Sequence, residues 1–426
     1  MRRVVITGIG LITSLGVGTD PTWQGLLDGR SGIGAIQGFN ASSLQSQLGG
    51  EVKDFEPEQF VVNRRTLRTM TRSDRFAVAA AALAVQDAQL DMTAQDGGRC
   101  ALFVGSSKEV SDPMQMLEAY EAALNPDGTA DIHRFGESAR STAPPLFYVE
   151  GLQAASLFYI SAAHGLKGAN TYFAGTAESG AVAVGTAYRA IRRGEADVAL
   201  AGGFDDAVSW WTMSKYDALG IMTDRNDLGA AACRPYDVHR TGTVFGEGGA
   251  MLLLEEHAAA VARGVRRYAE IVGFGSGHDA WKLVAPHPEG RGLALAMKAA
   301  LRESSSTPDA ITYVAAHGSG TKLGDSSEAR AIRSVFGPAV ETLVASSIKP
   351  ATGHLMAGAG ALNVAVAALA LHHQTVPPTL NLETVDPECR LDWVPGEARA
   401  VQGNQAVALA RGLEGQNVAL VLRAVQ

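Results

Sequence analysis

The stretch VVITGIG, residues 4–10, opens the chain with an apolar run that ends in two glycines, Gly8 and Gly10. β-Branched residues in an unbroken apolar run predict a buried strand, and glycines at its end indicate a loop. Met1-Arg2-Arg3 in front of this run imitates a signal peptide, but such a segment is usually helical and poor in glycine. We therefore expect an interior strand that leaves into a glycine loop.

Runs of the same kind recur along the whole chain, and alanine-rich stretches with helical spacing separate them. The expected strands lie at 4–10, 100–107, 170–175, 196–205, 248–256, 268–275, 311–316, 342–347, 405–410 and 417–423. The expected helices lie at 74–90, 180–193, 292–303, 325–335 and 358–373. This alternation predicts an α/β fold, and its repetition predicts two similar halves, which we bound at 1–255 and 256–426.

One region interrupts this alternation. Residues 108–150 carry scattered proline, glycine and charge, and we interpret them as an inserted helical excursion from the N-terminal half. Long insertions in compact folds are often functional, so this excursion is a candidate interface.

Composition excludes several classes of function. The chain has 426 residues, of which 46% are hydrophobic and 19% charged, so it can bury a core and is not disordered. Its net charge of −8 argues against a nucleic-acid or anionic-membrane binder. Three scattered cysteines suit a reducing compartment, and no apolar run reaches the length of a membrane span. We expect a cytoplasmic protein without a metal site.

Two late segments carry the candidate chemistry. AAHGSGTKLGD (315–325) has His317 just after an expected strand, and SSIKPATGHLMAGAGA (346–361) has Lys349 and His354 in a loop before an expected helix. Glycine around each histidine allows backbone and imidazole to approach a ligand closely. Two histidines in such similar settings, with a lysine beside one of them, are therefore candidates for ligand contact.

These segments belong to a wider pattern that resembles the β-ketoacyl synthase family of condensing enzymes. The matching blocks span the whole chain: VVITGIG (4–10), AGG (201–203), RPYDVHRTGTVFGEGGAMLLLEE (234–256), HGSGT (317–321), KPATGH (349–354) and VPPTLNLE (376–383). The resemblance implies a thiolase-like fold with two related halves in five α-β-α-β-α layers, and a two-fold dimer with its sites near the interface. It implies no cofactor, because the substrates are carried on the phosphopantetheine of an acyl carrier protein.

The family condenses acyl and malonyl thioesters with loss of carbon dioxide. By resemblance, His317 and His354 polarise the malonyl thioester and stabilise its enolate, and Lys349 orients them. A cysteine at a helix N-terminus, where the thiol pKa is lowered, accepts the acyl chain. Here the local sequence is AGTAESG, which has Ala177 at the cysteine position. Alanine cannot form a thioester, and Ser179 falls roughly 200° further round the helix.

The neighbouring pocket also departs from the family. Glu178 stands where the family has a small residue, and the loop that carries a gating phenylalanine reads GLEGQN, with Leu413 and Glu414. An engineered Cys→Ala change would touch one position only, so we interpret the changes as natural divergence. The segment 408–423 resembles the chain-length factor, or ketosynthase β subunit, of type II polyketide synthases.

The leading hypothesis is therefore a non-acylating subunit of a β-ketoacyl-[acyl carrier protein] synthase complex. It would form a heterodimer with a catalytic ketosynthase and close the tunnel that holds the growing chain. The resemblance assigns the chain-length residues to the excursion, where Met114, Leu117 and Tyr120 are spaced along one helix face and Met116 lies beside them.

Two alternatives remain open. The retained His317, His354 and Lys349 would suit a decarboxylase that turns malonyl-carrier protein into an acetyl starter unit, although a carboxylate at Glu178 would repel malonate. The chain could instead be an active-fold synthase whose cysteine was replaced by alanine. Many chain-length factors have lost the two histidines that this chain keeps. The product, an aromatic polyketide or a polyene, is not specified.

Overall fold

The computed structural model describes residues 1–108 and 113–425. Its first strand, β1 (Val4–Thr13), runs on through Gly8 and Gly10, so the expectation of a glycine loop is wrong. A Cβ atom at Gly8 would lie 2.1 Å from a backbone oxygen of helix α2 (Arg72–Asp87), and one at Gly10 would lie 2.0 Å from another. The two glycines therefore let the helix pack closely on the strand.

All the other expected elements are present, with ends shifted by a few residues. The remaining strands of the N-terminal half are β2 (Gly16–Val17), β3 (Gly34–Ala35), β4 (Leu48–Gly50), β5 (Cys100–Ser106), β6 (Asn170–Ala174), β7 (Val198–Asp205), β8 (Phe245–Gly246) and β9 (Gly248–Glu256). Its remaining helices are α1 (Thr19–Leu27), α3 (Leu117–Ala123), α4 (Ile132–Thr142), α5 (Phe147–Glu150), α6 (Ala155–His164), α7 (Ala177–Arg192) and α8 (Trp210–Ala218).

The C-terminal half repeats this organisation. Its strands are β10 (Ala269–His278), β11 (Tyr313–Ala315), β12 (Val344–Ser346), β13 (Thr375–Val376), β14 (Asp392–Trp393), β15 (Arg399–Ala400), β16 (Gln405–Arg411) and β17 (Gln416–Arg423). Its helices are α9 (His257–Arg263), α10 (Arg291–Ser304), α11 (Lys322–Phe336), α12 (Lys349–Thr352) and α13 (Ala357–His373).

Sheet topology confirms the two related halves. The strands β6-β5-β7-β9-β1 of the first half correspond in order and direction to β12-β11-β16-β17-β10 of the second. Antiparallel pairing of β1 with β10 joins both sets into one 12-stranded mixed sheet. In the same comparison, α7 corresponds to α13, because each follows the second parallel strand of its half. The boundary at residue 255 stays a prediction.

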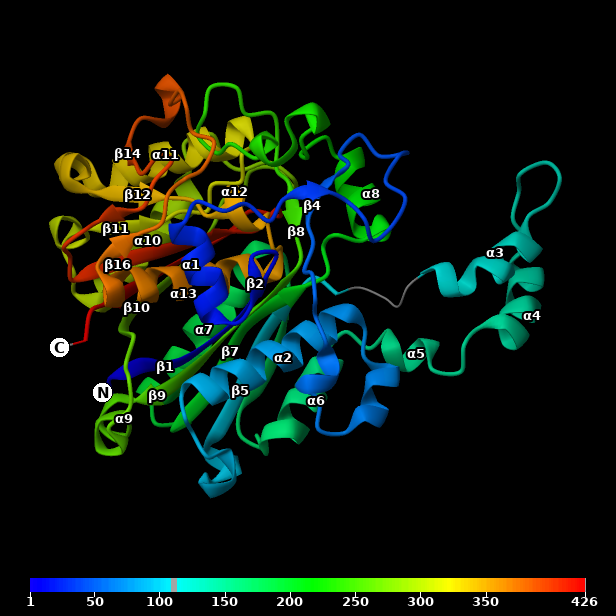
Figure 1. Cartoon of the computed structure of the whole chain (residues 1–426), viewed down its shortest axis with the longest axis horizontal. Coiled ribbons are helices and arrows are strands. Elements are labelled where there is room, and N and C mark those ends of the chain that lie inside the picture. The colour runs from blue at the N-terminus through cyan, green and yellow to red at the C-terminus, as the bar shows by residue number, and fades with distance from the viewer. Residues whose placement is uncertain (109–112, 426) are drawn as a thin grey trace.

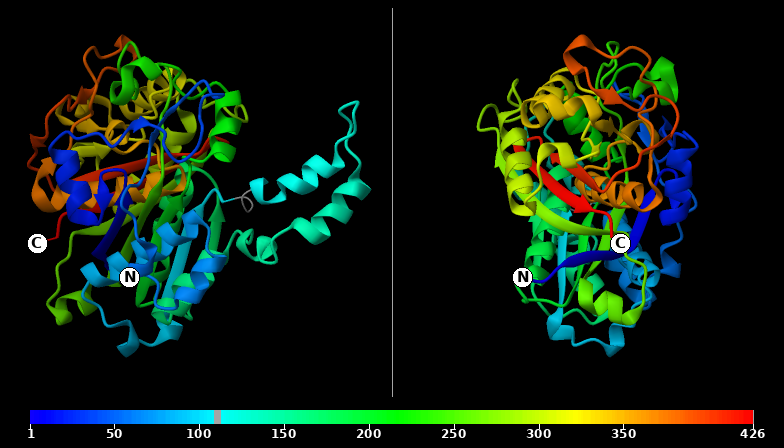
Figure 2. Two further views of the ribbon diagram at one scale, coloured as in Figure 1. Left: turned by 45° about the vertical axis from the view of Figure 1, so that its right-hand side comes forward. Right: turned by 90° about the vertical axis from the view of Figure 1, so that its left-hand side faces the viewer.

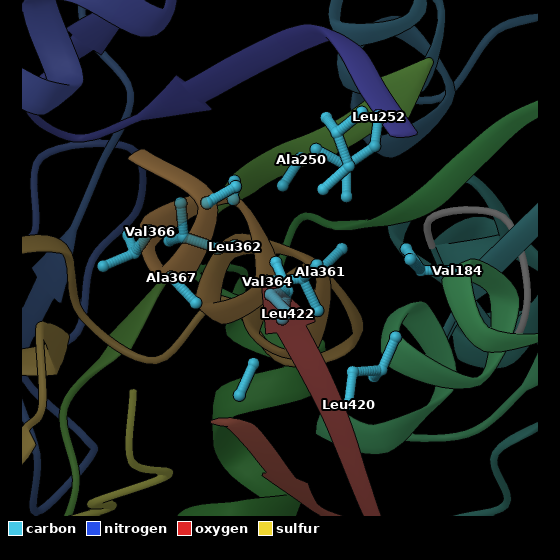
Figure 3. Packing of buried hydrophobic residues seen from close by; sticks show 14 of the residues in the cluster. Val184, Ala250, Leu252, Ala361, Leu362, Val364, Val366, Ala367, Leu420 and Leu422 are labelled. Carbon is cyan, nitrogen blue, oxygen red and sulfur yellow. The ribbon is translucent and has the colours of Figure 1, made fainter. Parts of the chain in front are cut away.

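Five layers result from this arrangement, as the resemblance implied. Helices α7 and α13 are packed between the two parts of the sheet, α2 and α6 cover the outer face of the first part, and α10 and α11 cover the outer face of the second (Figure 1). Figure 3 shows side chains of α13 beside Ala250 and Leu252 of β9 and Leu420 and Leu422 of β17. Since α13 is almost wholly apolar and buried, its burial anchors the residues at its N-terminus.

Strand β6 differs from the prediction of a buried strand. It lies at the edge of the sheet, paired with β5 on one side only, and its residues are exposed or half-buried. The run NTYFAG has the composition of a buried strand, but within residues 1–108 and 113–425 only β5 pairs with it.

The excursion at 108–150 is confirmed as helical where it is described. Helices α3, α4 and α5 form an arm that projects from the body of the molecule (Figure 2). Residues 109–112 of this segment lie outside the described residues. Among the helices that are described, none is both long and apolar enough to cross a membrane.

Candidate functional site

The first residue of α7 lies in a cavity between the two halves. Strand β6 ends at Ala174, the chain turns at Thr176, and the helix starts at Ala177. A cavity of about 250 Å³ is lined by Ala177 together with His317, His354 and Leu413, which come from three other loops. The structure thus brings together four of the residues that sequence analysis singled out.

The two histidines face each other inside this cavity. Their ring centroids lie 5.3 Å apart and their planes meet at 79°. The Nδ1 atom of His354 accepts a hydrogen bond from the backbone N–H of Met356 at 3.0 Å. A neutral imidazole whose Nδ1 accepts carries its proton on Nε2, so His354 can donate a hydrogen bond from that atom.

Both imidazoles are neutral at pH 7. Burial lowers the pKa of His317 well below its ordinary value, and the neighbouring Lys349 and His354 lower it further. Burial and Lys349 lower the pKa of His354 in the same way. Neutral imidazoles that donate hydrogen bonds into a shared cavity can bind a thioester carbonyl and stabilise an enolate oxygen.

Lys349 supports His317 from outside the cavity. Its ammonium group donates a hydrogen bond to the carbonyl oxygen of His317, and burial lowers the Lys349 pKa to about 8. On the other side, the carboxylate of Glu328 accepts hydrogen bonds from the backbone N–H groups of His317 and Gly318, at 2.7 and 2.8 Å. The strand end that carries His317 is therefore fixed by two buried charged groups.

Backbone strain and close packing also mark the site. Met356, which precedes α13, has φ 45°, a conformation that costs a residue with a side chain about 1–3 kcal/mol. Within α13, a Cβ at Gly360 would lie 2.4 Å from the carbonyl oxygen of Ala177. The two central helices thus touch where the cavity is formed, and glycine permits that contact.

Glu178 and Glu414, expected at the same pocket as Leu413, do not line the cavity. Glu178 is buried and lines a second cavity of about 440 Å³, beside Phe173 and His278. Burial, and to a smaller extent the nearby carboxylate of Glu414, raise the pKa of Glu178 to about 7. Both glutamates are therefore behind the helix N-terminus and not among the residues that face the histidines.

Ser179 also belongs to this second cavity. Its hydroxyl donates a hydrogen bond to the carbonyl oxygen of Thr176 at 2.8 Å. Ser179 and Ala177 lie on different sides of α7, as their spacing along a helix predicted. Cys100, Cys233 and Cys389 are buried and none lines the histidine cavity.

The excursion residues divide into two groups. Met114, Leu117 and Tyr120 line one apolar groove of about 880 Å³ together with Trp210 and Trp211 of α8. Met116 is buried and lies outside this groove. Because α3 begins only at Leu117 and a 3₁₀ turn precedes it, one helical phase does not describe all four residues.

Sequence reasoning missed several residues around the site. Arg411 and Tyr216 line the histidine cavity, and Lys108 and Asp206 line a polar cavity next to it. Charged residues directly after the buried strands β5 and β7 were a signal that could have revealed the second pair, because ligands of α/β sheets gather at the carboxyl ends of strands. Among the described residues, no three His, Cys, Asp or Glu side chains are grouped as metal ligands.

Comparison with known families matches nearly the whole chain. Residues 1–260 match the family described as Beta-ketoacyl synthase, N-terminal domain, and residues 268–383 match Beta-ketoacyl synthase, C-terminal domain. A 3-oxoacyl-[acyl-carrier-protein] synthase 2 of Synechocystis sp. is 35% identical over 100% of this chain and 99% of its own length. The protein of the same name from Coxiella burnetii is also 35% identical, over 100% of this chain and 99% of its own.

Solved structures give a complementary result. The ishigamide ketosynthase/chain length factor superimposes with a TM-score of 0.87 and 30% identity, and a β-ketoacyl synthase from Burkholderia phymatum with 0.87 and 32%. AntDE, a type II ketosynthase solved with its acyl-carrier protein AntF and bound to a hexaketide, superimposes with 0.87 and 28%. Each match covers 100% of both chains.

Proposed function

This chain belongs to the β-ketoacyl synthase family, and on that premise we propose that it is a non-acylating subunit of the chain-length-factor kind. It pairs with a catalytic ketosynthase and shapes the tunnel for the growing acyl chain in polyketide biosynthesis. The observation that carries this proposal is the methyl group of Ala177 at the start of α7, in the cavity with His317 and His354. A helix N-terminus favours a thiolate, and alanine has no thiol to activate.

The surface around α7 supports pairing with a similar subunit. Strand β6, which leads directly into Ala177, has one unpaired edge. The groove on the excursion exposes Met114, Leu117 and Tyr120, each more than 40% accessible to solvent. An open strand edge and an exposed apolar surface are both features of protein interfaces. The proteins named ketosynthase/chain length factor and AntDE share this fold and support the same assembly here.

An acyl carrier protein is the second partner that we propose. Arg64, Arg65 and Arg68 form an exposed basic cluster on a chain whose net charge is −8. The last of these also lines the polar cavity between the arm and the body. Such a local excess of positive charge suits an acidic protein partner, and the substrate would reach the pair on that partner's phosphopantetheine. No cofactor of the chain's own is part of the proposal.

Co-expression with a cysteine-containing ketosynthase from the same organism tests the proposal. We expect one complex on size-exclusion chromatography with both chains in equal amounts, and polyketide formation only when both are present. The matched control is the same ketosynthase with its cysteine replaced, which should form the complex without product. Separate monodisperse peaks, or full activity of the ketosynthase alone, would end the proposal.

A decarboxylase is the second candidate, favoured by the intact His317–His354 pair and its support by Lys349. The expected repulsion of malonate by Glu178 is weakened, because this carboxyl group lines another cavity and has a pKa raised to about 7. The test is carbon dioxide release from labelled malonyl-carrier protein by the purified chain. Release no faster than from a His317→Ala control would remove this candidate.

The third reading, a synthase fold that lost only its cysteine, is favoured by the names of the curated relatives, which are synthases. This candidate and the leading proposal predict different effects of Ala177→Cys on condensation activity. Restored condensation by the single chain would support it, whereas a chain-length-factor-like subunit should remain unable to condense.

A further inference from the structure

The second cavity, which Glu178 lines, opens beside the edge of β6 that pairs with no described strand. Its volume is about 440 Å³, and Phe173 and Ala174 of that strand form part of its wall. These two residues and Ser276 are exposed or half-buried, whereas Glu178 is only 4% exposed. The cavity therefore leads from the surface proposed above for the partner subunit to a buried carboxyl group.

The inner end of this cavity and the loop behind it carry hydrogen-bond acceptors without matching donors. The Oε1 atom of Gln416, which lines the cavity, and the Oε2 atom of Glu414 are fully buried and have no hydrogen-bond partner among the described residues. Glu178 accepts a hydrogen bond from the hydroxyl group of Thr176 at 3.1 Å. Burying carboxyl and amide oxygens without donors costs free energy, and a donor from another molecule would remove that cost.

These acceptors lie close together. A Cβ atom on Gly412 would lie 2.4 Å from Oε2 of Glu178 and 2.8 Å from Oε1 of Gln416, so the two oxygens approach the same point of the loop. The carboxylate of Glu414 is near enough to raise the pKa of Glu178. In residues 1–108 and 113–425, neither of the two carboxyl groups forms an ion pair. A cation is therefore the group that this set of oxygens lacks.

The other residues of the cavity indicate which kind of cation fits. Phe173, Ala174 and Val182 give it apolar walls. His278 lines it from an exposed position, and its Nδ1 atom already accepts the backbone N–H of Ala280 at 2.9 Å. Lysine and arginine have an apolar stem and a cationic head, which match apolar walls and buried acceptors. A metal ion would make no use of such walls.

We infer that this cavity receives a lysine or arginine side chain of the partner ketosynthase, which forms an ion pair with Glu178 and a hydrogen bond with Gln416. The inference rests on the proposed function, because it needs the partner at the β6 edge. A second copy of this chain would bring no cation on its own β6, whose sequence is NTYFA. The ion pair therefore favours a heterodimer over a homodimer. It gives Glu178 a role in recognition of the partner.

Binding of this chain to a cysteine-containing ketosynthase from the same organism tests the inference. The dissociation constant is measured by surface plasmon resonance at pH 8, where Glu178 is mostly ionised in the free chain. Glu178→Gln keeps the shape of the side chain and removes its charge. We expect it to raise the dissociation constant at least ~30-fold, mainly through faster dissociation. Because this variant loses a buried charge, weaker binding would not be due to unfolding.

Two further measurements make the assignment specific. Glu341→Gln, at an exposed position of the C-terminal half, is the matched control and should leave the dissociation constant unchanged. In a double-mutant cycle, each lysine and arginine on or beside the ketosynthase strand that corresponds to β6 is replaced by methionine. One of these changes should weaken binding to the wild-type chain about as much as Glu178→Gln does, and should have little effect on binding to Glu178→Gln.

Equal affinity of the wild-type chain and Glu178→Gln, or a cycle in which no basic residue couples to Glu178, would overturn the inference and leave the proposed function intact. Thermal stabilisation of the isolated chain by potassium or magnesium chloride that Glu178→Gln abolishes would also overturn it, because a free ion would then occupy the cavity. If the wild-type chain and the ketosynthase did not bind each other, both the inference and the proposed function would be wrong.

Discussion

The hydroxyl group of Thr176 donates a hydrogen bond to the carboxylate of Glu178, at 3.1 Å between Oγ1 and Oε2. The same hydroxyl oxygen accepts the backbone N–H of Leu413 at 3.0 Å. One side chain thus links the start of α7 to the loop between β16 and β17. Position 177 lies next to this link. A substitution there therefore changes the side chain while the two linked segments keep their positions.

Ala177→Cys should give a reactive thiol without a condensing enzyme. The N-terminus of α7 lowers the pKa of a thiol at position 177, whereas burial raises the pKa of Cys233 and of Cys389 to about 12. Iodoacetamide followed by peptide mass spectrometry should therefore label position 177 first. Leu413 lines the cavity at the position where the family resemblance implies a gating phenylalanine, so we expect chain extension by the single subunit below ~1% of the partner's rate.

An acyl adduct on the thiol introduced at position 177, together with chain extension in the absence of a partner, would contradict this expectation. The control is the wild-type chain under the same labelling, where all three cysteines are buried.

Substitutions in the apolar groove should change product length. Tyr120 is half exposed in the groove and packs against Phe135, with ring centroids 5.2 Å apart and ring planes inclined by 32°. Tyr120→Ala enlarges the groove and should lengthen the main product by one or more extension units, while turnover of the pair stays within about threefold. Product masses from the reconstituted pair measure this.

Met116 provides the contrast, because it is buried outside the groove. Met116→Ala should lower the thermal stability of the chain, at a cost of about 2–5 kcal/mol, and leave product length unchanged. A length change from Met116→Ala with none from Tyr120→Ala would refute the assignment of the groove.

Glu178→Gln should remove a pH-dependent loss of stability. Glu178 is 4% exposed and its pKa rises to about 7 in the folded protein, whereas it stays near 4.5 when unfolded. Between these values the folded chain binds a proton that the unfolded chain lacks, so the free energy of unfolding falls as pH rises. Below pH 4.5 both states are protonated, and the cost is absent.

Glu178→Gln removes the ionisable group and with it the pH-dependent loss of stability. The amide oxygen of the glutamine can still accept a hydrogen bond from Thr176. The stability advantage of the variant over wild type should grow by roughly 3 kcal/mol from about pH 4.5 to about pH 8, measured by urea unfolding. Other carboxyl groups with a raised pKa, such as Asp205 and Asp325, are present in both proteins, so their contributions to stability cancel in the difference. An advantage that is constant with pH would show that folding does not raise the pKa of Glu178.

Gly360→Ala should destabilise the chain, although alanine has a higher helix propensity than glycine. Alanine favours a helix interior by roughly 1 kcal/mol over glycine. A Cβ at this position, however, would lie 2.4 Å from the carbonyl oxygen of Ala177 and 2.9 Å from the Cβ of Ala181, so α13 would be pushed from α7. We expect a lower Tm by differential scanning calorimetry.

Gly136→Ala in α4 is the matched control. Nothing lies within 4 Å of a Cβ there, so propensity alone should act and stability should rise slightly. If both variants gained stability, the close contact between the central helices would be disproved.

The order of strands and helices and the two related halves follow from the sequence pattern, and the resemblance to the β-ketoacyl synthase family implied that His317 and His354 act together. Local apolar runs of period 2 or 3.6 encode the elements, and motifs such as KPATGH encode the loops between them. The absence of a thiol at position 177 is likewise a property of the residue itself. These features depend on short segments, which is why they can be read without coordinates.

Other features depend on segments that meet only in the folded chain. The NTYFAG run forms an exposed edge because, among the described residues, no strand pairs with the far side of β6. Gly8 and Gly10 lie within a strand, where the lack of a Cβ lets α2 pack closely on it. The position of Glu178 behind the helix N-terminus depends on the loop that carries Glu414, more than 200 residues away in sequence. The environment of Asp206 likewise comes from α2, β5 and α8 at once, because desolvation and charge–charge distance are set by tertiary packing and not by neighbours in the chain.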